Sequence, residues 1–113
     1  MIKATFTRDE HGDIVKFLIT GHADHGDYGK DIVCAGVSAV SIGAVNGIEA
    51  LAGFAPQVDA DEVNGGHLLV EATGAATGEQ NHIAQILLEN LVLSVQSIAD
   101  QYPDYVHVTT QQA

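Results

Sequence analysis

A histidine and the chain's single cysteine stand close enough in the sequence to form a catalytic pair. They are His22 and Cys34, within the stretch GHADHGDYGKDIVCAGVS from Gly21 to Ser38. Cysteine attacks as the thiolate, and a nearby imidazole can take its proton or stabilise it as a cation. A lone cysteine is more often an ordinary buried residue, so its pairing with His22 is what favours a nucleophile.

Other residues of this stretch could assist the pair. Asp31 could orient His22 or simply cap the following helix, and Ser38 could hydrogen-bond within the site or to its own backbone. Three glycines free the backbone to close over a bound peptide, with ordinary turns as the alternative. They are Gly21, Gly26 and Gly29.

A metal site is the chemical alternative, because several ligand types share this stretch: His22, Asp24, His25 and Cys34. Structural zinc sites usually show a second pair of closely spaced ligands, whereas the other histidines are scattered singly. We therefore expect no metal and no cofactor. We expect these other histidines to be surface or turn residues: His11, His67, His82 and His107.

Two elements must position the pair. The segments IKATFT and IVKFLIT alternate apolar and polar residues around the turn-like DEHGD, which predicts a β-hairpin ending just before His22. Apolar residues at three- and four-residue steps predict a helix from about Ile32 to Ala52, with Cys34 in its first turn. Unpaired amides there favour the thiolate.

The segment from Ile32 to Ile48 carries no charge and has the minimum length for a membrane span. Its serines, asparagine and glycines instead favour a soluble helix buried on several sides. Three of these residues would let another element approach closely: Gly36, Gly43 and Gly47.

The rest of the chain predicts a second hairpin, a second helix and a last strand. Asn64 and Gly65 suit the hairpin turn, Thr77 and Gln80 can form a capping box, and YVHVTT is strand-like, followed by a loose tail from Thr109. Six apolar residues form a predicted stripe on the second helix: Ile83, Ile86, Leu87, Leu91, Val95 and Ile98. The order ββαββαβ predicts an α+β fold with two helices on a mostly antiparallel sheet.

Composition limits the possible partners. The chain has 113 residues and a formal net charge of -11, which disfavours direct binding to nucleic acids or anionic lipids and would attract a basic partner. We expect a single domain, residues 1–113. One cysteine forms no internal disulfide, and the first residues resemble no secretory signal, so we expect a cytoplasmic protein.

The pattern GHA, two residues, G, two residues, GKDIVCAGVS resembles the signature of the Prp family of ribosomal-processing cysteine proteases, and the resemblance extends over the whole chain. It implies a cytoplasmic, homodimeric endopeptidase that removes an N-terminal extension from a large-subunit ribosomal protein, the twenty-seventh of the standard series. His22 matches the family's catalytic histidine and Cys34 its nucleophile. Asp31 and Ser38 match other motif positions.

The resemblance also implies cleavage after an aromatic residue with a basic segment following. Asp24 and Asp27 would then attract that segment. Cys34 would attack the scissile carbonyl, amides at the helix start would stabilise the oxyanion, and His22 would protonate the leaving amine. His25 is a second imidazole that could take the role of base.

A function of another class remains open. An acidic chaperone or binding module could hold a basic ribosomal protein without catalysis, and the net charge supports it equally well. The pairing of His22 with Cys34 favours the protease, because binding alone does not need it.

Overall fold

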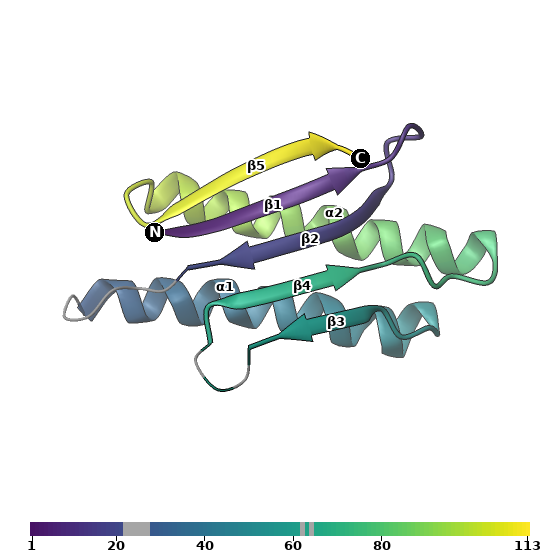
Figure 1. Ribbon diagram of the computed structural model, residues 1–113, viewed down its shortest axis with the longest axis horizontal. Helices are drawn as coiled ribbons and strands as arrows, with labels where there is room; N and C mark the ends of the chain where they lie inside the picture. Colours follow the sequence, from purple (N-terminus) through teal and green to yellow (C-terminus); the bar gives the residue numbers. More distant parts are fainter. Residues whose placement is uncertain (22–27, 62, 64) are drawn as a thin grey trace.

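The computed structural model describes residues 1–21, 28–61, 63 and 65–113, and for residues 28–31 it describes the backbone alone. The elements are β1 (Ile2–Arg8), β2 (Ile14–Thr20), α1 (Tyr28–Gly47), η1 (Ile48–Ala52), β3 (Gln57–Ala60), β4 (His67–Glu71), α2 (Gly78–Gln101) and β5 (Val106–Gln112). The strands form one sheet in the order β3-β4-β2-β1-β5, antiparallel except for the β1–β5 pair. Both helices lie on one face of it (Figure 1). The predicted α+β fold is confirmed.

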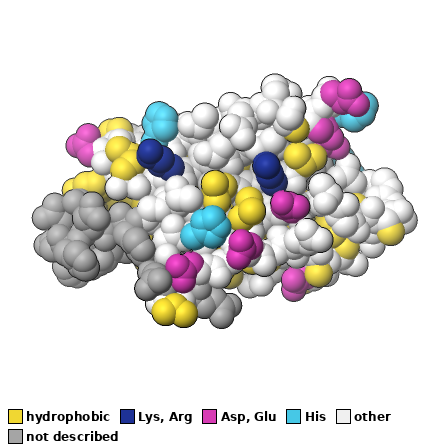
Figure 2. All heavy atoms as spheres, viewed as in Figure 1, with side chains coloured by type: hydrophobic (Ala, Val, Ile, Leu, Met, Phe, Trp, Pro, Cys, Tyr) yellow, Lys and Arg dark blue, Asp and Glu magenta, His cyan; other side chains and the backbone are white. Residues whose placement is uncertain are grey.

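The core lies between the sheet and the two helices. Phe6 on β1 and Phe17 on β2 are paired across the strands, with ring centroids 5.9 Å apart, and both are fully buried. Because side chains alternate along a strand, Lys3 and Lys16 point to the other face and are exposed. Figure 2 shows that face, where basic, acidic and histidine side chains are scattered around a few apolar ones.

Helix α1 begins four residues earlier than the sequence predicts, at Tyr28 instead of Ile32. Gly29, predicted to free the backbone ahead of the helix, lies in its first turn. One glycine inside a helix costs only about 1 kcal/mol, which the packing of a 20-residue helix offsets. The predicted C-terminal part, Ile48–Ala52, forms the π-helical segment η1 and ends at Gly53, whose φ of 84° suits glycine.

The prediction that this helix is buried on several sides is wrong. It packs one face on the sheet and on α2, while Ile32 and Ile42 are more than half exposed. Gly36 and Gly47 do face α2, where an added Cβ would meet Ile98 and Leu87 at 3.7 and 3.4 Å. Gly43 has no such neighbour within 4 Å, so its predicted role in close packing is also wrong.

By length and composition alone, Ile32–Ala52 and Gly78–Gln101 are both apolar enough to cross a membrane. Core helices of soluble proteins pass the same test. Both segments contribute residues to the hydrophobic core beneath the sheet, Ile48 and Leu88 among them. Their apolar character therefore has a structural explanation within the fold.

The second half of the chain follows the prediction with two differences. Thr77 caps α2 by accepting a hydrogen bond from the Gln80 amide at 3.1 Å, as predicted. Five residues of the predicted apolar stripe on α2 are buried or packed against the core, but Ile86 is 56% exposed, and the fully buried Ala84 and Leu88 extend the stripe instead. The tail after Thr109 is not loose, because β5 continues to Gln112 beside β1. Asn64 lies outside the described residues.

Candidate active site

The cysteine lies on the face of α1 that turns toward the sheet. Val33 and Val37 are buried in the core, and Cys34 between them is half-buried with a free thiol. Because α1 begins at Tyr28, Cys34 lies in the second helical turn, so its predicted position in the first turn is wrong. Its amide belongs to the intrahelical ladder, and the field of the unpaired amides falls off within the first turn.

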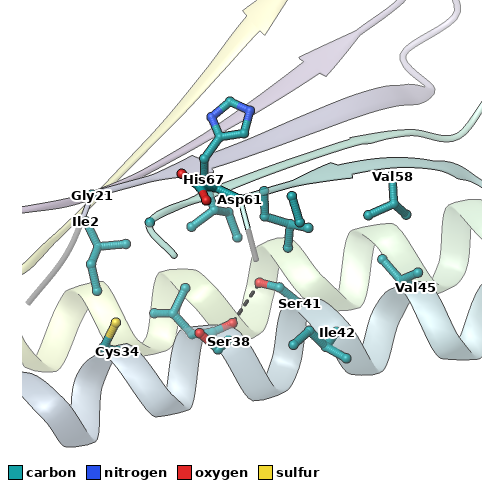
Figure 3. Close-up of a pocket in the computed structure, with 15 residues that line it drawn as sticks. Ile2, Gly21, Cys34, Ser38, Ser41, Ile42, Val45, Val58, Asp61 and His67 are labelled. Carbon is teal, nitrogen blue, oxygen red and sulfur yellow. Dashed lines mark hydrogen bonds between the residues drawn. The ribbon is translucent and has the colours of Figure 1, made fainter. Parts of the chain in front are cut away.

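The thiol opens into a cavity of about 390 Å³ between α1 and the ends of the strands, hereafter the Cys34 cavity. Figure 3 shows the sulfur directed toward Ile2, with Ser38, Ile42 and Val45 following along the helix. The cavity is lined by Ile2, Ile19, Gly21, Cys34, Val37, Ser38, Ser41, Ile42, Val45, Val58, Ala60, Asp61, Gly66, His67 and Leu68. A cysteine on the wall of a largely apolar cavity fits attack on a bound peptide.

Gly21 joins three parts of the chain at the edge of this cavity. Its φ is 101°, and a Cβ there would overlap the carbonyl oxygen of Met1. Its amide donates to the Gly66 carbonyl in the β3–β4 connection at 3.0 Å. Only glycine fits this conformation and this contact. The residue that follows is His22, so Gly21 fixes where the chain leaves β2 toward the predicted catalytic histidine.

Two serines of α1 line the cavity in different ways. Ser41 is fully buried and donates its hydroxyl to the Val37 carbonyl at 2.7 Å, so its hydrogen-bonding role is structural. Ser38 is exposed and lies one helical turn after Cys34. The sequence left open whether the Ser38 hydroxyl bonds to its own helix backbone. Of the two serines, Ser41 alone forms such a bond. The Ser38 hydroxyl therefore remains available to a ligand.

Several predicted site residues lie outside the described residues: His22, Asp24, His25, Gly26 and Asp27. Gly29 and Asp31 are placed by their backbone within the first turn of α1. A helix cap precedes the first helical residue, so the alternative that Asp31 caps the helix is wrong. The structure brings together Gly21, Cys34 and Ser38 on one cavity.

The histidines expected at the surface are there. His11, His67, His82 and His107 are exposed. His67 also borders the Cys34 cavity, but Figure 3 shows its ring directed away from Cys34, with Nε2 3.9 Å from Asp59 Oδ2. It is therefore not placed to take a proton from the thiol. Among the described residues, no three potential metal ligands are grouped.

Sequence reasoning missed the far wall of the cavity. Ile42, Val45 and Val58 line it together, although β3 and α1 are separate elements. The exposure of Ile42 is 53% and that of Val58 is 47%. No motif marks such residues, because only the pairing of β3 with β4 brings Val58 over α1.

Comparison with known proteins agrees with this geometry. The family model described as Cysteine protease Prp matches residues 1–107. The ribosomal processing cysteine protease Prp of Bacillus subtilis strain 168 is 42% identical over 110 residues, which are 97% of each chain. Two crystal structures of an essential ribosomal processing protease Prp from Staphylococcus aureus superpose closely, one with a covalently linked product peptide and one with a substrate peptide.

The complex with the product peptide has a TM-score of 0.83 and 36% identity, and the complex with the substrate peptide has a TM-score of 0.84 and 34% identity. Each comparison covers 97% of this chain and 99% of the other. Identity of this extent, together with a free thiol on a peptide-sized cavity, decides between the protease and the non-catalytic binding module. The chain belongs to the Prp family of ribosomal processing cysteine proteases.

Proposed function

We propose that this protease removes the N-terminal extension of a large-subunit ribosomal protein, the twenty-seventh of the standard series, in the cytoplasm. The observation that carries the proposal is the Cys34 thiol on the wall of a cavity large enough for a peptide. The peptide complexes of the related Staphylococcus aureus protease support peptide binding by this fold. A single cysteine with no disulfide partner suits a reducing compartment.

The charge of the chain supports a basic substrate. Fifteen acidic residues stand against four lysines and arginines. Ribosomal proteins bind RNA phosphates and are commonly basic, so a field of this sign would speed their encounter with the enzyme. Asp61, just after β3, lines the cavity, and the exposed Asp59 lies on β3 itself, so both add to this field.

In the proposed reaction the Cys34 thiolate attacks the scissile carbonyl and forms a carbon–sulfur bond. The carbon–nitrogen bond breaks as His22, in its protonated form, gives its proton to the leaving amine. Water, activated by the now neutral His22, then hydrolyses the thioester and restores the thiolate. Asp31 orients His22 in this scheme.

A donor other than the amides predicted at the helix start is also available to the oxyanion. The Cys34 amide is bonded within α1, so it is not among the unpaired amides at the helix start. Ser38 offers a hydroxyl on the same cavity wall, one turn beyond the nucleophile. We therefore assign to Ser38 a hydrogen bond to the substrate near the reacting carbonyl.

We also propose that the protein is a homodimer, as the family resemblance implies. The outward side of α1 supports this proposal, since it is uncharged and exposed over four turns. Its residues are Ile32, Ala35, Ala39, Gly43 and Asn46. Such a face on a protein of charge -11 suits contact with a second copy.

Sedimentation velocity tests the dimer. We expect a single species of twice the 11.8 kDa chain mass at micromolar concentration. Ala39→Glu would place a charge in the proposed contact and shift the species to a monomer, because burying an unpaired carboxylate is costly. Glu79→Gln on α2 is the control. A monomer for the parent chain at all concentrations would contradict the dimer.

Mass spectrometry of the ribosomal protein before and after incubation tests the proposed cleavage. We expect loss of the N-terminal extension with the parent enzyme and none with Cys34→Ala. His22→Ala should lower kcat by about 10²- to 10⁴-fold, the usual contribution of a general acid–base. His25→Ala, the matched control, should keep most of the activity. The reverse order would make His25 the base, and cleavage by Cys34→Ala would reject the nucleophile.

Substitution of the two serines tests the role of Ser38. Ser38→Ala should lower kcat/KM by about tenfold, the cost of one hydrogen bond to the reacting group. Ser41→Ala removes a buried bond within the helix and should change mainly the midpoint of thermal unfolding. Equal kcat/KM values for the two variants would show that Ser38 has no particular contact with the substrate.

A further inference from the structure

We infer that Gln85 on α2 is a positioning residue for the reaction, because it fixes β2, which leads to His22, relative to the helix that carries Cys34. Its side-chain amide holds the backbone of Ile14, the first residue of β2, by two hydrogen bonds. This inference rests on the proposed pairing of His22 with Cys34 and adds to it a residue that acts from the other end of β2.

The two hydrogen bonds take the place of a missing strand. Strand β4 pairs with β2 only as far as Glu71, and Ala72 then donates to the Val15 carbonyl. Beyond that point Gln85 Oε1 accepts from the Ile14 amide at 2.7 Å, and Gln85 Nε2 donates to the Ile14 carbonyl at 2.9 Å. Gln85 therefore exchanges both backbone bonds with Ile14, as a partner residue in an antiparallel ladder does.

A neighbouring side chain holds the Gln85 amide in this orientation. Asn81, one turn earlier on α2, accepts from Gln85 Nε2 at 3.5 Å and donates to Asp13 Oδ2 at 3.0 Å. Gln85, Asn81 and Asp13 are all partly buried. Hydrogen bonds are directional, and they are electrostatically stronger away from water. The start of β2 is therefore attached to one place on α2.

Helix α2 contacts both β2, which leads to the histidine, and α1, which carries the cysteine. Two residues after Gln85, Leu87 packs on Gly47 of α1, where an added Cβ would lie 3.4 Å from the leucine side chain. Nearer the other end of α2, Ile98 packs on Gly36, two residues after the cysteine. The position of β2 relative to α1 is therefore set through α2.

Apolar packing defines the position of β2 along its own axis less sharply than these bonds do. Ile14 and Phe17 are fully buried in the core, but the hydrophobic effect is non-directional and depends on the area removed from water. A small slide of the strand keeps most of that area buried, whereas it lengthens and bends both bonds to Gln85. The two bonds therefore oppose such a slide.

A shift at Ile14 reaches the histidine because β2 is held as one piece. The strand is paired on both sides, with β1 and β4, and runs from the hairpin to the end of the sheet at which α1 begins (Figure 1). Gly21 follows its last residue, and His22 comes next in the sequence. A general base must lie within about 2.6–3.2 Å of its partner, and a misplacement of about 1 Å can cost about 100-fold in rate.

Gln85→Met tests the inference in the whole protein. Methionine has a similar length but forms neither bond to Ile14, so kcat for cleavage of the ribosomal protein should fall about tenfold to 100-fold, while KM stays within about twofold. Thr77→Ala is the matched control, because it removes the hydrogen bond that caps α2 and no bond to β2. Its kcat should equal that of the parent at a temperature where circular dichroism shows both variants folded.

Alkylation of Cys34 by iodoacetamide reports the pairing without a substrate. An imidazolium beside the sulfur keeps part of the thiol ionised, so a paired cysteine still reacts at pH 6. The rate at pH 6 relative to that at pH 9 should fall several-fold in Gln85→Met and stay unchanged in Thr77→Ala. A merely structural role would lower only the midpoint of thermal unfolding. That result, or an equal loss of kcat in both variants, would overturn the inference.

Gln85→Glu decides the question if Gln85→Met does not fold. It keeps an acceptor for the Ile14 amide and loses only the donor, so both effects should appear at smaller size, and parent values for both would reject the role. If the parent does not cut the ribosomal protein but the alkylation ratio falls in the Gln85 variants, the proposed substrate is wrong and the positioning role stands. If the ribosomal protein is cut and neither readout changes, the role of Gln85 is wrong and the function stands.

Discussion

The packing of one face of α1 against the sheet determines the rest of the site. Val33, Val37 and Ala44 on α1, and Ile48 at the start of η1, are buried beneath the strands, and this burial fixes the rotation of the helix about its axis. Cys34 follows Val33 directly, so its thiol lies at the border between the core and the cavity. A rotation that buried or exposed the thiol fully would also pull these four residues out of the core, which would cost several kcal/mol.

The sheet contributes the second constraint, at the ends of its strands. Gly21 ends β2 in a conformation that suits glycine, against Met1 and with a hydrogen bond to Gly66. The same hydrogen bond ties the β3–β4 connection to the end of β2 beside the cavity. One glycine thus fixes both the end of β2, from which the chain continues to His22, and the approach to β4, which pairs with β3 and so positions Val58. The position of the reacting thiol and the shape of the substrate cavity therefore depend on the same packing.

Local patterns in the sequence predicted most of the elements, and contacts between distant segments explain what they did not predict. Alternation predicted the first hairpin, the turn residues Asn64 and Gly65 predicted the second, and Thr77 marked the start of α2. The parallel pairing of β5 with β1 joins the two ends of the chain, which no local pattern encodes. The motif indicated Cys34 and Ser38, which share the cavity, but Val58 reaches it only through the strand order. The start of α1 was misplaced because Gly29 has a low helix propensity that packing outweighs.

The central claim is that Cys34 forms the covalent bond to the substrate. A peptide that carries the residues before the cleaved bond and ends in a chloromethyl ketone would alkylate the nucleophile that attacks its carbonyl region. Intact mass followed by peptide mapping would locate the adduct. We predict one peptide per chain, attached to Cys34. Attachment to a histidine or to any other residue, or no labelling by a peptide whose amide counterpart is cleaved, would contradict the account.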